Sequence, residues 1–245
     1  MKFNEAMDAV KRGKKVRRRS WREEYSVTNI YIWKPDELVV YNNGVAYQLT
    51  NVDMLAEDWE IAFGRMYFGS LMVKGGIVQI PEDPRSDGDM IGYNRPDIMI
   101  ADTKPGFEIS WLHLKDNIYI CDRGLINRVS WNTLKEAGYV DGKEVTIDGK
   151  RCLIRLMTGS DGSKGSYGKG CDNEWDLFMD KYDEDNELTH YKDMYTWCKE
   201  VDCDYSDCRS VRGYGSARNC SYYNAASTAS VIAFRPALEI LNTEE

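Results

Sequence analysis

The sequence has no apolar run of the eighteen or more residues that a membrane-spanning helix needs, and its N-terminus carries charges without an apolar segment. We therefore expect a cytoplasmic protein without a secretory signal. Histidine is scarce, since His113 and His190 are the only two. The G-x-S-x-G and H-E-x-x-H motifs of hydrolases are also absent. With so few candidate bases, we expect no enzyme activity and no catalytic residues.

Cysteine is missing from the first 120 residues, and all seven cysteines follow. An odd number of cysteines in a chain without an export signal favours reduced thiols over a disulfide framework. A zinc site could be formed by His190 with three of them, Cys198, Cys203 and Cys208. Their spacing is not the paired C-x2-4-C of structural zinc. We therefore predict no metal and no other cofactor.

The charge of the chain is unevenly distributed. Residues 1–22 hold nine Lys or Arg against Glu5 and Asp8, a local charge of +7, which leaves −15 for the rest of a chain whose net charge is −8. One basic segment suits a small, multiply phosphorylated ligand better than a nucleic-acid polymer, which requires a broad positive face. The alternative is that these cations only form a solvated face. We expect neither a nucleic-acid polymer nor a membrane as partner.

Local patterns near the start predict one helix followed by short strands. The helical spacing is carried by four apolar residues, Phe3, Ala6, Met7 and Val10. Asn4 is a candidate N-cap and Gly13 a candidate helix end. Strand patterns follow at 29–33, 38–41 and 45–49, with an Asn-Asn-Gly turn at 42–44. Because one helix cannot cover such a sheet, we expect a homo-oligomer.

The remainder of the chain also mixes helices and strands. Strand patterns occur at 118–120, 143–147 and 152–157, the last two joined across Asp148-Gly149, while helices are predicted from Trp131 to Gly138 and from Asn173 onward. We predict an α+β fold with three parts: a small helix-on-antiparallel-sheet domain at 1–65, a linker or strand extension at 66–106, and a mixed α+β domain at 107–245.

Two segments carry a family resemblance. The stretch Val52 to Glu60 reads VDMLAEDWE, and it closes a unit that opens with a short helix, a Gly-Lys turn and a basic strand. This pattern resembles the phage Thoeris anti-defence family of small sponge proteins. The resemblance implies a phage or prophage protein that sequesters a cyclic nucleotide immune signal in the host bacterial cytoplasm, without catalysis.

Binding a cyclic nucleotide requires aromatic planes for the base, cations for phosphate and polar groups for the ribose or base edge. Trp21, Tyr31 and Trp33 offer planes, and Arg17, Arg18 and Arg22 offer cations. The resemblance adds Phe3 and the 53–59 stretch, in which Leu55 and Trp59 are interpreted as core residues. The predicted ligand-binding residues are Phe3, Asn4, Arg18, Trp21, Tyr31, Asn51 and Asp53.

The C-terminal part has a second resemblance. The pattern R-G-x-x-x-x-R at 212–218, followed by F-R-P-x-L at 234–238, resembles sulfatase-modifying-factor and C-type-lectin-like domains, including those of phage proteins. It implies a C-type-lectin-like fold for residues 107–245. The alternative function is therefore a phage structural or adhesive protein whose lectin-like domain recognises a surface glycan or protein, with Tyr214, Tyr222 and Tyr223 at the contact surface.

Overall fold

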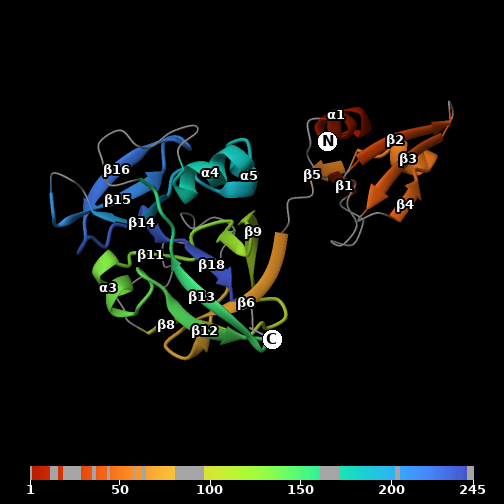
Figure 1. The fold of residues 1–245 in the computed structure, drawn as a ribbon. Coiled ribbons are helices and arrows are strands. Elements are labelled where there is room, and N and C mark those ends of the chain that lie inside the picture. The colour runs from red at the N-terminus through yellow and green to blue at the C-terminus, as the bar shows by residue number, and fades with distance from the viewer. Residues whose placement is uncertain are drawn as a thin grey trace. The chain divides into compact units, whose positions relative to one another are not determined.

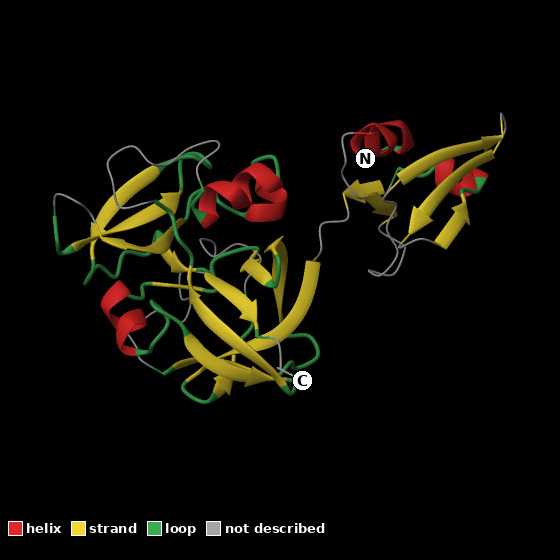
Figure 2. Cartoon of the chain, in the orientation of Figure 1, coloured by secondary structure: helices red, strands yellow, loops and turns green. Residues whose placement is uncertain are grey.

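The computed structural model describes two compact units, residues 1–65 and 66–245. Both units are rich in strands and have a few short helices (Figures 1 and 2). The described residues are 2–11, 16–18, 29–34, 37–42, 45–57, 59–61, 65–80, 97–160, 172–201 and 205–241.

The described part of the first unit combines two helices with two small antiparallel sheets. Its elements are α1 (Phe3–Lys11), β1 (Val16–Arg18), β2 (Asn29–Lys34), β3 (Glu37–Asn42), β4 (Val45–Gln48), α2 (Asn51–Met54) and β5 (Trp59–Ile61). Strand β1 pairs with β5, and β2, β3 and β4 form a meander. Asn42 lies opposite Val45, which confirms the two predicted strands on either side of residues 43–44. Those two turn residues lie outside the described part.

Helix α1 packs against β1, β2 and β5. Ala6 and Met7 on its predicted apolar face are buried, together with Val16 of β1, and Phe3 is partly buried. The helix begins at Phe3, so the predicted N-cap at Asn4 is wrong. The backbone N–H of Lys2 instead donates to the Glu5 carboxylate at 2.8 Å, one residue before the helix begins. The predicted helix end at Gly13 lies outside the described residues.

A curled eight-stranded sheet is the larger part of the second unit (Figure 1). Its path runs β12-β13-β18-β10-β9-β6-β7, with β8 paired to β6, and β8 also lies against β12. The strands are β6 (Arg65–Val73), β7 (Gly76–Ile77), β8 (Ile98–Ala101), β9 (Glu108–Lys115), β10 (Ile118–Cys121), β12 (Lys143–Ile147), β13 (Lys150–Leu156) and β18 (Pro236–Ile240). Residues 65–80 and 97–101 thus supply three of its strands.

A five-stranded sheet and three helices make up the rest of the described part of this unit. The sheet order is β11-β17-β14-β15-β16, with β14 and β17 parallel. The elements are β11 (Ile126–Asn127), α3 (Trp131–Glu136), α4 (Glu174–Lys181), α5 (Asn186–Thr189), β14 (Tyr195–Val201), β15 (Cys208–Gly213), β16 (Cys220–Asn224) and β17 (Ile232–Phe234). The predicted helices at 131 and 173 are confirmed, and Ser130 and Asn173 are their N-caps.

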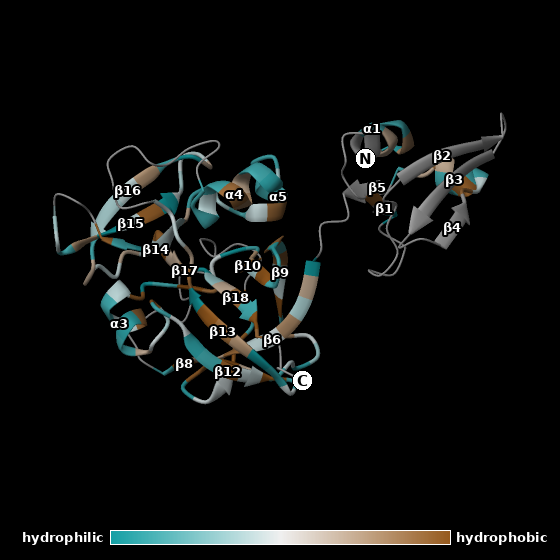
Figure 3. Ribbon diagram, in the orientation of Figure 1, coloured by the Kyte–Doolittle hydropathy of each residue, from teal (hydrophilic) through white to brown (hydrophobic). Residues whose placement is uncertain are grey.

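The core of the second unit lies between its two sheets. Along β13, the buried residues Cys152, Ile154 and Leu156 alternate with the partly buried Leu153 and Arg155. Figure 3 shows that hydrophobic and hydrophilic stretches both occur along the strands of this unit. Large aromatic side chains fill the interior, including Trp111, Trp175 and Trp197, each fully buried. The α+β class agrees with this architecture, whereas the C-type-lectin-like fold of residues 107–245 remains a prediction. Among the described residues, no helix is long and apolar enough to cross a membrane.

Candidate functional site

The two charged residues predicted for the ligand site contact each other in the first unit. Arg18 ends strand β1, and its Nη1 donates to Asp53 Oδ1 at 3.0 Å and toward the Val52 carbonyl at 3.5 Å. The Arg18 side chain is 13% exposed and that of Asp53 only 6% exposed. The pair is therefore largely withdrawn from water, where a charged hydrogen bond is stronger than at an open surface.

A helix cap fixes the position of Asp53. Its Oδ2 accepts hydrogen bonds from the Thr50 backbone N–H at 3.0 Å and the Thr50 hydroxyl at 2.7 Å. The backbone N–H of Asp53 donates to Thr50 Oγ1 at 3.3 Å, which completes a capping box at the start of α2. One carboxylate oxygen of Asp53 therefore holds the helix start and the other holds Arg18. Thr50 therefore orients the side chain of Asp53, and Asp53 in turn orients the guanidinium of Arg18.

The other predicted ligand residues lie at three places in the first unit. Phe3 and Asn4 lie in the first turn of α1, and Asn51 opens α2, with Asn4 and Asn51 exposed. Tyr31 is on β2, opposite Val39, and its side chain is outside the described part. Trp21 lies wholly outside the described residues. The structure shows the contact between Arg18 and Asp53, and the full set remains a prediction.

Thr50 is not among the predicted site residues, although the sequence around it contains a recognisable capping pattern. Thr50 and Asp53 have the T-x-x-D spacing of a capping box. The interpretation of Leu55 as a core residue is wrong, because it is 82% exposed. Val52 beside it is 72% exposed, so α2 and the residue after it present an apolar surface. The side chain of Trp59 lies outside the described part.

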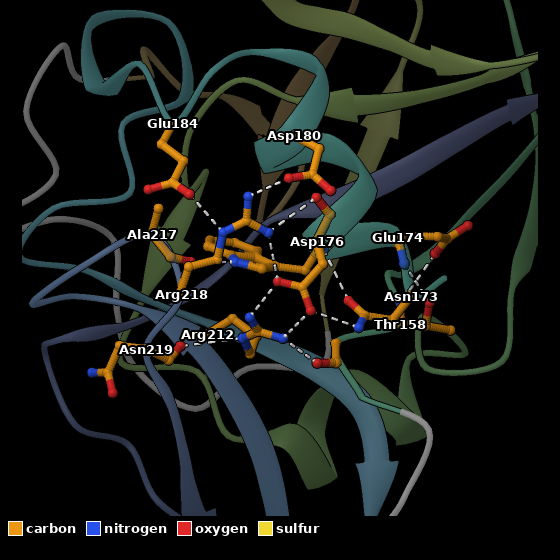
Figure 4. Close-up of polar contacts among 12 residues, drawn as sticks. Thr158, Asn173, Glu174, Asp176, Asp180, Glu184, Arg212, Ala217, Arg218 and Asn219 are labelled. Carbon is orange, nitrogen blue, oxygen red and sulfur yellow. Dashed lines mark hydrogen bonds and ion pairs between the residues drawn. The ribbon is translucent and has the colours of Figure 1, made fainter. Parts of the chain in front are cut away.

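The arginines of the C-terminal motif converge on one buried aspartate (Figure 4). Arg212 donates to both oxygens of Asp176, at 2.7 and 3.1 Å, and both side chains are fully buried. Arg218 Nη1 donates to Asp176 Oδ1 at 3.0 Å, and Asn173 donates to Oδ2 at 2.7 Å. Both carboxylate oxygens have two donors each, so this buried charge is fully paired.

Arg218 extends the same network toward the surface. Its remaining nitrogens donate to Asp180 at 2.5 Å and to Glu184 at 2.7 Å (Figure 4). Burial lowers the pKa of Arg218, but the three carboxylates outweigh it and raise that pKa overall. Arg212 and Arg218 thus join strand β15 and the loop after it to helix α4. The R-G-x-x-x-x-R pattern is explained here by packing rather than by chemistry on a substrate.

Arg235, the arginine of the F-R-P pattern, is fully buried over the ring of Trp175 at 5.5 Å. Its Nη2 donates to the His190 carbonyl at 2.8 Å, while Nε and Nη1 have no hydrogen-bond partner among the described residues. Burial lowers its pKa to about 10, and likewise raises the pKa of Cys121 nearby to about 12. A thiol with so high a pKa stays protonated at neutral pH and is a poor nucleophile.

Both histidines have hydrogen-bonded partners. His113 on β9 contacts the Asp116 carbonyl through Nε2 at 2.9 Å and Lys181 Nζ through Nδ1 at 3.0 Å, so both of its ring nitrogens have hydrogen-bond partners. His190 Nε2 lies 3.1 Å from a guanidinium nitrogen of Arg123. The five described cysteines are free thiols, and Cys171 and Cys203 lie outside the described part. The zinc site considered from the sequence includes Cys203, so the arrangement of its four residues is not described as a whole.

Residues 1–62 match the family model Tad2-like, the Thoeris anti-defense 2-like domain. The match covers the first unit almost completely and includes α1, the Arg18–Asp53 pair and β5. It confirms the resemblance predicted for the N-terminal part of the sequence. No curated protein and no solved structure matches the chain. The lectin-like resemblance of the C-terminal part therefore remains a prediction.

Proposed function

We propose that this is a phage or prophage protein whose first unit sequesters a cyclic nucleotide immune signal in the host bacterial cytoplasm and so blocks Thoeris antiphage defence. The observation that carries the proposal is the match of residues 1–62 to the Thoeris anti-defense 2-like domain. The proposal includes no catalysis, because sequestration acts by mass action and requires only affinity and copy number. The name of the domain supplies the defence system. The cyclic nucleotide ligand is what the family resemblance implies, and the aromatic, basic and polar residues of the first unit are compatible with it.

The Arg18–Asp53 pair is the proposed centre of ligand recognition. Phosphate is bound well by a guanidinium whose direction is fixed, because less side-chain freedom is lost on binding. The Thr50 cap holds Asp53, and Asp53 holds Arg18 at 3.0 Å. Trp21 and Tyr31 are proposed to supply the stacking planes. The local charge of +7 in residues 1–22 favours a multiply phosphorylated ligand in the same place.

A second copy of the chain is the proposed partner of the first unit. Val52 and Leu55 are 72% and 82% exposed, and Met54 is 37% exposed on the same short helix. A small unit with a single long helix gains stability when such residues are covered. Since these residues adjoin Asp53, association would enclose the ligand site between subunits.

The test begins with the full-length protein expressed in bacteria that carry an active Thoeris system. After purification and denaturation, mass spectrometry should find a bound nucleotide with the mass of the free signal. Calorimetry with cyclic di-GMP, cyclic ADP-ribose and 3′,5′-cyclic AMP then measures affinity, and light scattering of the same samples measures the number of subunits. A protein that carries no nucleotide and binds none of the three probes contradicts the proposal. A changed mass would indicate catalysis, and a monomer at micromolar concentration contradicts the enclosed site.

Three variants localise the site. Arg18→Ala should weaken binding by about 1.5–3 kcal/mol, the range for hydrogen bonds to charged groups. Arg18→Lys should recover part of that loss, because an ammonium keeps the charge without the fork of donors. Trp21→Ala should cost about 1–3 kcal/mol through lost stacking. The matched control is Lys2→Ala, which removes a cation that is 68% exposed and 3.9 Å from Glu57. Equal losses of affinity in the Lys2→Ala control and the Arg18 variants would show a general effect of charge and not a binding site at Arg18.

A further inference from the structure

Two fully buried arginines lie on the side of the five-stranded sheet against which helix α4 packs. Arg212 is on β15 and Arg235 joins β17 to β18, and their guanidinium carbons are 5.9 and 5.5 Å from the centre of the Trp175 ring of α4. Arg212 forms a bidentate ion pair with Asp176. Among the described residues, no carboxylate forms such a pair with Arg235. The two cations therefore differ in how their charge is compensated.

Most of the hydrogen-bonding capacity of Arg235 is unused. Its Nη2 donates to the His190 carbonyl at 2.8 Å. Its Nε and Nη1 are buried and have no hydrogen-bond partner in the described part of the chain. A buried donor without an acceptor is costly, and folded proteins usually satisfy such groups with protein atoms, water or an ion. A guanidinium can only donate, so the ligand that suits these two nitrogens is an acceptor.

A second unsatisfied group lies on the same side of the sheet. Thr196 on β14 is fully buried, and its hydroxyl Oγ1 has no hydrogen-bond partner among the described residues. Thr196 pairs in parallel register with Ala233, which is two residues before Arg235. Aligned residues and residues two apart along an extended chain point to the same side of a sheet. The Thr196 hydroxyl and the Arg235 guanidinium therefore belong to one buried layer.

The groups around Arg235 leave its charge without a net counter-charge. Burial lowers the pKa of Arg235 only to about 10, so the side chain is a cation at neutral pH. Asp122 is close enough to oppose this effect, but Arg123 forms an ion pair with Asp122 at 2.9 Å and cancels its charge. The neighbouring thiols of Cys121 and Cys198 are protonated, because burial raises the pKa of both. Water would satisfy the free N–H groups, whereas an anion would also neutralise the charge.

We propose that Arg235 and Thr196 bind one small monovalent anion, of the size of chloride, inside the second unit. Its hydrogen-bond donors are Nε and Nη1 of the guanidinium and the threonine hydroxyl. Close packing in the same layer favours a single-atom ion over a larger anion, since a Cβ added at Gly124 would meet the Cβ of Ala233 at 2.5 Å. The proposal is independent of nucleotide sequestration, because it concerns a different unit and a different ligand.

The first experiment measures urea unfolding of the full-length protein at constant ionic strength, with chloride replacing gluconate, an anion too large for the site. Tryptophan fluorescence follows the transition of the second unit. A ligand that binds only the folded state stabilises it by mass action. Above saturation, a tenfold rise in chloride should therefore lower the unfolding equilibrium constant of this unit about tenfold, and bromide should act in the same way. Equal stability in chloride and gluconate would overturn the proposal.

Three variants localise the effect. Arg235→Met removes the cation and should abolish the chloride dependence. Thr196→Val removes the hydroxyl and should require about two- to tenfold more chloride for the same stabilisation, as for the loss of one hydrogen bond. The matched control is Lys199→Met, which removes a cation of the same strand that is 43% exposed and should keep the full dependence. A chloride dependence that persists in Arg235→Met, or that is lost in Lys199→Met, would contradict the assignment.

Crystals of the wild-type protein grown in bromide locate the ion even if the Arg235 variant does not fold. Anomalous scattering should show bromide beside Nε or Nη1 of Arg235. A water molecule at that place, or bromide bound only at the protein surface, would overturn the proposal.

Discussion

Asp176→Asn is the most informative test of what holds the second unit together. The substitution keeps the shape of the side chain, but it removes the charge and places an NH2 group where an oxygen accepts from a guanidinium. Asp176 is fully buried and accepts four hydrogen bonds, two from Arg212 and one each from Arg218 and Asn173. Arg212, also fully buried, would lose the carboxylate with which it forms a bidentate ion pair.

Breaking a buried ion pair by changing one partner costs about 3–5 kcal/mol. The lower end applies here, because Arg218 keeps Asp180 and Glu184 and because Arg212 keeps the carbonyls of Gly159 and Asn219. We therefore expect Asp176→Asn to lower the free energy of unfolding of the second unit by about 3 kcal/mol.

The assay is urea unfolding of the full-length protein followed by tryptophan fluorescence, with the transition of the second unit fitted separately from that of the first. Trp175 contacts this network, with its ring 5.9 Å from the Arg212 guanidinium, so its emission should report the loss. Glu144→Gln is the control, since Glu144 and its partner Arg151 are 64% and 58% exposed at 3.0 Å. It should cost less than about 0.5 kcal/mol. A cost below about 1 kcal/mol for Asp176→Asn would refute the reasoning.

Two further predictions concern the Thr50 cap in the first unit and the Glu200 carboxyl in the second. Thr50→Ala should destabilise the first unit by about 1 kcal/mol, the usual value of an N-cap, and Thr50→Ser should restore most of it; identical thermal melts by circular dichroism would contradict the role of the cap. Glu200 accepts hydrogen bonds from the Gly159 N–H at 3.0 Å and Ser210 at 3.1 Å, but burial dominates and raises the pKa of its carboxyl. The folded state then binds more protons than the unfolded state above the ordinary glutamate pKa, so this carboxyl makes stability fall as pH rises. Glu200→Gln should therefore gain stability relative to wild type as the pH rises above the ordinary glutamate pKa of 4.5 in urea titrations, and a difference independent of pH would reject the assignment.

Local structure was readable from the sequence at several places where neighbouring residues determine it, although the N-cap predicted at Asn4 was wrong. The hairpin at Asp148-Gly149 is confirmed, and both residues have positive φ, at 47° and 77°. Asn173 caps α4 as its side-chain chemistry indicates. Pairing between distant segments was not readable, because periodicity contains no information about which strand lies beside which. Thus β18 lies between β13 and β10, although it follows them by about eighty residues or more.

The candidate site shows the same limit in its contacts. Arg18 and Asp53 were each selected for the chemistry of their own side chains, and nothing in either segment indicated that they would pair with each other. Leu55 was misplaced because apolar residues are common at surfaces as well as in cores. In the second unit, the two arginines of the 212–218 pattern were recognised in the sequence, but Asp176 was not identified as their common partner.

The separation of Arg212 and Asp176 has a consequence for how the second unit folds. The two residues are 36 positions apart, on β15 and α4. If the sheet closed around the guanidinium before the helix arrived, an unpaired cation would be held in apolar surroundings, which is among the costliest states a partly folded chain can enter. We therefore expect the docking of α4 and the closure of the sheet to occur in one cooperative step. In this part of the molecule, helix and strand should then separate from each other only when both lose their structure.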